Sequence, residues 1–188
     1  MHFSPALVVG LGNPGAQYAA TRHNAGFWFM HMLADGAPFS VKSSLHGDLA
    51  VTAGCRLLRP ATFMNHSGCA TAAVANYFKI PPAAILVVHD EVALPAGTAR
   101  LKFGGGHAGH NGLADISKAL DSRDYWRLRL GVGAPPVGDT LADYVLRCPP
   151  AVEREAVDAA IDRVLSIWPS IAVGDYENAM LWLHTQEK

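Results

Sequence analysis

The 188-residue sequence contains little cysteine and little charge. Its three cysteines, Cys55, Cys69 and Cys148, are odd in number and far apart, which argues against a disulfide framework and against a cysteine-based zinc cluster. We therefore expect reduced thiols in a cytoplasmic protein. Cys69 lies in an alanine-rich segment, where a buried and inert thiol is the favoured interpretation.

Long hydrophobic runs are missing as well. The sequence has no apolar stretch long enough to cross a bilayer, and no basic segment followed by an apolar run at its start. We therefore expect neither a membrane span nor a secretion signal. Half of the residues are hydrophobic and 16% are charged, which indicates a globular chain. The length suits one domain over residues 1–188.

The net charge of −1 hides an uneven distribution. Residues 100–130 carry six basic and three acidic side chains, a net of +3, whereas residues 151–188 carry three basic and seven acidic ones, a net of −4. A basic segment can attract a polyanion even when the whole protein is nearly neutral. Ordinary surface charge explains the same pattern equally well.

Short apolar runs alternate with helical spacings along the chain. We predict strands at residues 6–10, 85–88, 100–103 and 128–132, a hairpin of residues 49–53 and 55–59, and helices at 25–35, 67–78, 113–120, 152–168 and 176–184. Pro169 is expected to end the helix before it. Interleaved strands and helices indicate an α/β fold, and the hairpin favours a mixed sheet. The prediction is a single domain with a mixed, mostly parallel central sheet flanked by helices.

The most informative segment is the glycine-rich run at residues 104–112, Gly-Gly-Gly-His-Ala-Gly-His-Asn-Gly. Such a run adds nothing to a hydrophobic core, and its backbone loses much entropy when it is ordered. Flexible linkers favour glycine with serine and have no use for imidazoles. We therefore interpret the run as a binding or catalytic loop that presents His107, His110 and Asn111.

Four further motifs lie at the ends of predicted strands or before predicted helices. The run Gly10 to Gly15 has the glycine spacing of a dinucleotide fingerprint, but polar residues follow it and no acidic residue ends a second strand. A tight turn that presents Asn13 fits better. His23 lies in the polar loop beyond, where α/β proteins bind ligands. The other two motifs are residues 63–66 (FMNH) before a helix and residues 89–91 (HDE) after a buried strand.

Together these motifs supply a histidine, a carboxylate and several amides, but no good nucleophilic side chain. A Gly-x-Ser-x-Gly motif is missing, and the histidines lack the helical spacing of metal ligands. The set suits hydrolysis by an activated water. An imidazole takes the proton of the water, a carboxylate orients the imidazole, and amides stabilise the oxyanion.

Residues 18–26 (YAATRHNAG) and 109–113 (GHNGL) resemble the two signatures of bacterial-type peptidyl-tRNA hydrolases. Residues 10–15, 62–65, 89–91 and 127–133 resemble the same family in the same order, so the resemblance spans nearly the whole chain. It implies hydrolysis of the ester between a peptide and the 3′ ribose of tRNA, which recycles tRNA from stalled translation. It also implies a monomer that needs no metal or cofactor, with peptidyl-tRNA as its partner and no membrane.

The resemblance gives each matching residue a role. It implies that His23 is the general base and that Asp90 orients it. Asn13 would contact the peptide, and Asn65 and Asn111 would hold the substrate and the attacking water. Contacts to the tRNA end, the cleft or the ester are implied at Tyr18, Phe63, Met64 and His110, and contacts to phosphate at Lys102 and Arg129.

Two positions depart from the family pattern. Ala114 stands where a basic residue is expected, and Ala108 replaces a frequent glycine although alanine tolerates a positive φ less well.

Two other functions stay open: a noncatalytic RNA-binding module that uses the basic segment, and a nucleotide-binding oxidoreductase that uses residues 10–15. The presence of His23, Asp90 and the asparagines favours the hydrolase over both.

Overall fold

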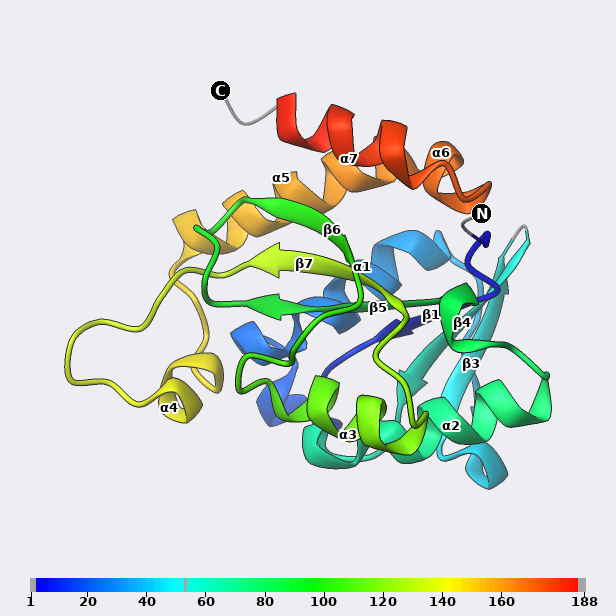
Figure 1. Cartoon of the computed structure of the whole chain (residues 1–188). Coiled ribbons are helices and arrows are strands. Elements are labelled where there is room, and N and C mark those ends of the chain that lie inside the picture. Colours follow the sequence, from blue (N-terminus) through cyan, green and yellow to red (C-terminus); the bar gives the residue numbers. More distant parts are fainter. Residues whose placement is uncertain (1–2, 53, 186–188) are drawn as a thin grey trace.

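The computed structural model describes residues 3–52 and 54–185. Seven strands form one sheet in the order β2-β3-β4-β1-β5-β7-β6 (Figure 1). The four central strands β4, β1, β5 and β7 run parallel, whereas β2, β3 and β6 pair antiparallel at the two sides. The predicted α/β fold with a mixed, mostly parallel sheet is therefore confirmed. The strands are β1 (Leu7–Gly10), β2 (Ser40–Lys42), β3 (Gly47–Thr52), β4 (Cys55–Pro60), β5 (Ile85–Glu91), β6 (Ala99–Phe103) and β7 (Trp126–Gly131).

Helices cover both faces of the sheet (Figure 1). One face carries α1 (Ala25–Ala34), α5 (Ala151–Ser166), α6 (Trp168–Ala172) and α7 (Tyr176–Thr185), and the other carries α2 (Ser67–Tyr77) and α3 (Asn111–Ala119). Alternate strand residues supply the two cores, since Val8 packs in the first, and Leu7 and Val9 in the second. The helix α4 (Leu141–Val145) lies outside these layers, and short 3₁₀ helices fill the loops: η1 (Ala16–Tyr18), η2 (Arg22–Asn24), η3 (Ser43–Leu45), η4 (Met64–His66) and η5 (Pro82–Ala84).

Most predicted elements are present with shifted ends. The hairpin forms with Thr52 opposite Cys55, while residue 53 lies outside the described residues, as do the domain ends at 1–2 and 186–188. The short edge strand β2 and the helix α4 were not predicted. No helix in the described part of the chain is both long and apolar enough to cross a membrane.

Two local predictions are wrong. Pro169 does not simply end a helix but lies in the first turn of α6, where a proline's missing N–H leaves no hydrogen bond unmade. The Cys69 thiol is exposed, not buried. The helix α2 packs on the core through Ala70 and Val74, and Cys69 lies on the side that faces away from that core.

The carboxyl ends of β1, β4 and β5 meet at one edge of the sheet, where α/β proteins place their ligand sites. Gly26, at the start of α1, allows the chain after β1 to fold tightly over this edge. A Cβ at Gly26 would lie 2.3 Å from the backbone nitrogen of Leu11 and 2.5 Å from the carbonyl oxygen of Val88, closer than such atoms approach. Glycine therefore lets η2, which carries His23, lie directly beside the end of β5.

Candidate active site

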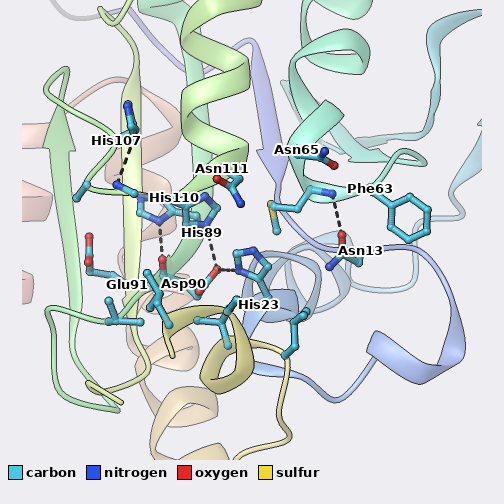
Figure 2. A pocket seen from close by; sticks show the side chains of 18 residues that line it. Asn13, His23, Phe63, Asn65, His89, Asp90, Glu91, His107, His110 and Asn111 are labelled. Atoms are coloured by element: carbon cyan, nitrogen blue, oxygen red, sulfur yellow. Dashed lines mark hydrogen bonds and ion pairs between the residues drawn. The ribbon is translucent and has the colours of Figure 1, made fainter. Parts of the chain in front are cut away.

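A pocket of about 500 Å³ opens at this edge of the sheet (Figure 2). Eight of the predicted site residues line it. They come from the segments that follow β1, β4 and β6 and from the end of β5: Asn13, His23, Phe63, Met64, Asn65, Asp90, His110 and Asn111.

A histidine–aspartate pair lies in the wall of this pocket. The Nδ1 of His23 lies 2.9 Å from Oδ1 of Asp90, and the two side chains are 11% and 2% exposed. Burial opposes ionisation of Asp90, but the charges and hydrogen bonds of His23 and His110 outweigh it and hold the pKa of that carboxyl well below its usual range. Asp90 is therefore a carboxylate, so His23 donates through Nδ1 and keeps its Nε2 lone pair for a proton.

The same carboxylate oxygen has a second imidazole partner. Nε2 of His110 lies 3.1 Å from Oδ1 of Asp90, and Nδ1 of His110 accepts from the backbone N–H of Leu113 in the first turn of α3. A ring nitrogen that accepts carries no proton, so the Nε2 of His110 is the donor to Asp90. Both nitrogens of His110 are thereby engaged within the protein, which favours a role on Asp90 over the direct contact with the ester that the resemblance implies.

A third histidine, His89, is buried next to this pair. Its Nδ1 lies 2.7 Å from the carbonyl oxygen of Asp90 and donates to it, and its ring packs edge-on against His110. Nε2 has no partner among the described residues. Burial, together with repulsion from His110, lowers the pKa of His89 to about 3, so this imidazole stays neutral at ordinary pH.

The three asparagines occupy the other walls. Oδ1 of Asn13 accepts from the backbone N–H of Met64 at 2.7 Å, and the Asn13 backbone exchanges hydrogen bonds with the side chain of Asn24. These bonds fix the side chain of Asn13 and orient its NH₂ donors away from Met64. Asn65, in η4, and Asn111, the first residue of α3, are exposed and line the opening.

The glycine-rich run crosses from the end of β6 to the start of α3 and closes one side of the pocket. Arg127, 2% exposed on β7, donates to the carbonyl oxygens of Gly106 at 2.5 Å and Gly105 at 2.7 Å. Ala108 adopts φ 46°, a left-handed conformation that glycine tolerates better. The backbone of the loop is therefore held on the sheet while its far end delivers His110 and Asn111 to the pocket.

The remaining predicted site residues lie outside the pocket lining. Tyr18 packs edge-on against Phe63, with ring centroids 6.2 Å apart. Lys102 is exposed on β6. Arg129 pairs with Glu91, a residue of the pocket rim, at 3.0 Å.

One wall was missed in the sequence. Four residues on and just after α4 face the pocket, and we call them the α4 wall: Leu141, Ala142, Val145 and Leu146. A signal for this helix was present, since Thr140 and Asp143 have the spacing of a helix N-cap, and the Thr140 hydroxyl accepts from the Asp143 N–H at 3.1 Å.

His23, Asp90 and His110 also have the composition of a metal site, with ligand atoms within 4.8 Å of one another. To bind a cation through these atoms, both imidazoles would have to lose the protons that they donate to Asp90. His110 would then carry its proton on Nδ1 and lose its bond to Leu113. The hydrogen bonds therefore favour proton transfer over metal binding as the chemistry of this cluster.

The fold and the pocket define a class: an α/β protein with a histidine–aspartate pair and amide donors at the carboxyl ends of its parallel strands. The family model for peptidyl-tRNA hydrolase matches residues 7–188. A peptidyl-tRNA hydrolase of Azoarcus sp. (strain BH72) is 52% identical over 179 residues, covering 93% of this chain and 82% of that protein. One of Cupriavidus necator is 52% identical over 194 residues, covering 95% and 98%.

A solved structure agrees with the sequence comparisons. The crystal structure of peptidyl-tRNA hydrolase from Acinetobacter baumannii has a TM-score of 0.90 and 42% sequence identity, covering 97% of this chain and 96% of that one. The chain belongs to the peptidyl-tRNA hydrolase family, as its motifs predicted.

Proposed function

We propose that the protein hydrolyses the ester between a peptide and the 3′ ribose of tRNA by a water that His23 activates, and so recycles tRNA from stalled translation. The observation that carries this proposal is the pairing of His23 with the buried carboxylate of Asp90 in the wall of a pocket rimmed by Asn65 and Asn111. Membership of the family supports the choice of substrate.

The chemistry needs no covalent intermediate. Nε2 of His23 accepts a proton from water as the water oxygen attacks the ester carbonyl carbon, and Asp90 stabilises the imidazolium that forms. The bond to the ribose oxygen then breaks, and the imidazolium returns its proton to that oxygen. An ester has a better leaving group than an amide, so a water–histidine pair suffices.

Developing negative charge on the carbonyl oxygen has two sources of stabilisation. Asn111 is a side-chain donor at the pocket opening, and it is also the first residue of α3, whose positive end points toward the pocket. Asn13, fixed by Met64 and Asn24, offers amide hydrogens to the backbone of the peptide. Backbone-directed contacts suit a substrate whose peptide varies in sequence.

Contacts to phosphate are proposed for Lys102 and Arg129. Across the β6–β7 pair, Lys102 lies opposite Arg127 and Arg100 lies opposite Arg129. All four side chains are basic, so positive charge gathers on this part of the sheet, where Arg129 also pairs with Glu91. Phosphates bound beside such a basic cluster would position many tRNAs alike. Tyr18 and Phe63 would contact the terminal bases.

The protein acts as a monomer in the cytoplasm, without a metal or cofactor. All the groups required by the proposed chemistry come from one chain, and the scarcity of cysteine agrees with a reducing compartment. Its partner is the peptidyl-tRNA substrate itself.

The test is to incubate the pure protein, with a chelator present, with an N-acetylated aminoacyl-tRNA and with the same aminoacyl-tRNA left unblocked. We expect rapid release of the acetylated amino acid and little release of the free one. Binding of both tRNAs without release of either would favour a noncatalytic RNA-binding module instead.

A further inference from the structure

Arg22, the residue before His23, has a buried side chain that reaches away from the pocket lining. The side chain is 7% exposed, and its Nη1 donates to the carbonyl oxygens of Tyr144 and Arg147, both at 3.3 Å. Its Nη2 pairs with Glu153 at 2.8 Å. The guanidinium also lies over the ring of Tyr144, 4.1 Å from its centroid, and the Arg22 backbone N–H donates to the carbonyl oxygen of Arg147.

These partners belong to the end of α4 and the start of α5. The last carbonyls of a helix lack partners within the helix, and a cation there is favoured by the helix dipole. Arg22 fills both needs for α4. Glu153, in the first turn of α5, fixes the other side of the guanidinium fork.

The helix α4 depends on this anchor more than a core helix would. It has five residues, of which only Tyr144 and Val145 are buried, and Figure 1 shows it beside the body of the molecule, at the end of the long loop that follows β7. A further tie is the bond from the Tyr144 hydroxyl to the carbonyl oxygen of Val132 at 2.8 Å. Arg22 therefore joins a peripheral helix directly to the segment of the catalytic histidine.

The α4 wall faces the same pocket as His23, so both ends of this connection meet the bound ligand. We propose that Arg22 is a positioning residue that couples the α4 wall to His23. When an apolar side chain of the peptide packs on the wall, α4 is held in place, and the short backbone step from Arg22 holds the His23 ring on Asp90. This inference rests on the proposed function, and it adds that the rate of hydrolysis depends on what the α4 wall contacts.

A role limited to stability gives a different expectation. The Glu153 partner of Arg22 is 38% exposed, and an ion pair open to solvent on one side contributes little net stability. Losing it would slow all substrates alike through the folded fraction. Coupling predicts selectivity. Arg22 should raise kcat for a substrate whose large apolar side chain packs on the α4 wall. For a glycyl substrate, which has no side chain to contact the wall, Arg22 should change kcat little.

The experiment compares kcat and KM for N-acetylphenylalanyl-tRNA and N-acetylglycyl-tRNA in Arg22→Lys and wild type. A lysine keeps the charge but presents its donors from a single nitrogen, so it cannot reproduce the spread of the planar guanidinium across two carbonyls and a carboxylate. We expect kcat for the phenylalanyl substrate to fall about tenfold with KM nearly unchanged, less than the hundredfold that a misplacement of about 1 Å costs. For the glycyl substrate we expect a change of less than about twofold.

The matched control is Arg154→Lys. Arg154 also stacks on an aromatic ring, that of Trp28 at 3.7 Å, and pairs with Asp158, but it touches neither α4 nor η2 in the described contacts. In Arg154→Lys, the ratio of kcat for the phenylalanyl substrate to kcat for the glycyl substrate should equal the ratio in wild type. An equal fall for both substrates in Arg22→Lys, or no fall for either, overturns the coupling.

If Arg22→Lys does not fold, judged by its thermal unfolding, then Glu153→Gln decides. It loosens the same guanidinium from the α5 side and should lower kcat for the phenylalanyl substrate alone, by about threefold. An unchanged kcat ratio in that variant overturns the coupling. Failure of the proposed function looks different, since wild type would then hydrolyse neither substrate.

Discussion

Replacing His89 by asparagine should make the protein less sensitive to acid. The imidazole is 2% exposed, and its pKa is lowered from 6.5 to about 3 in the folded protein, chiefly by burial and then by repulsion from His110. Between these two values the unfolded chain binds a proton at this position and the folded chain does not. Above pH 6.5, His89 therefore does not reduce the stability of the folded protein. As the pH falls from 6.5 toward 3, the free energy of unfolding decreases, because the unfolded chain gains a proton that the folded chain does not.

The size of the effect follows from the two pKa values. One unit corresponds to about 1.4 kcal/mol, so at pH 5, about 1.5 units below the unfolded value, protonation favours the unfolded state by about 2 kcal/mol. At pH 7 protonation of His89 favours the unfolded state by well under about 1 kcal/mol. Wild type should lose about 2 kcal/mol of unfolding free energy through His89 between pH 7 and pH 5.

The assay is urea unfolding at both pH values, followed by tryptophan fluorescence. His89→Asn keeps an amide donor near the carbonyl oxygen of Asp90 but does not titrate, so its loss should be smaller than that of wild type by about 2 kcal/mol. His184→Asn, at an exposed position on α7, is the control and should lose as much as wild type. Equal losses in wild type and His89→Asn would refute the account of a buried, neutral imidazole.

Four further substitutions test the site and its loop. Asp90→Asn should lower kcat on the order of a hundredfold, because an amide no longer orients His23 or stabilises its imidazolium; a kcat equal to that of wild type would contradict the pairing. Lys102→Ala and Arg129→Ala should raise KM for a full tRNA substrate more than for an N-acylaminoacyl adenosine, and equal effects on the two would argue against phosphate contacts. Ala108→Gly should raise the free energy of unfolding by up to about 1 kcal/mol in urea titrations, since φ 46° strains alanine, and a clear loss of stability would contradict that strain.

The parts of the fold with a strong local signal could be predicted from the sequence. Buried strands such as β1 and β5 are short apolar runs, ended by glycines after β1 and by polar residues in β5, and their parallel pairing brings the ends of both strands to one edge. This is why His23 and Asp90, 67 residues apart, meet in the structure at 2.9 Å. The family signatures supplied their roles.

What the sequence did not reveal depends on long-range contacts. The helix α4 has five residues and two buried side chains, too short for a periodic pattern, and its anchor Arg22 lies more than 120 residues earlier. The two partners of His110 likewise come from different segments, Asp90 on β5 and Leu113 on α3. The resemblance therefore suggested a contact of His110 with the ester, whereas its hydrogen bonds favour a role on the carboxylate of Asp90.

The most direct test of the proposed mechanism is the hydrolysis of an N-acetylated aminoacyl-tRNA by His23→Ala, with tRNA binding measured on the same preparation. The account predicts that hydrolysis is abolished while the dissociation constant for tRNA changes by less than about threefold, because His23 lies in the pocket and the proposed phosphate contacts lie on β6 and β7. A variant that binds tRNA and hydrolyses the ester at the wild-type rate would contradict it.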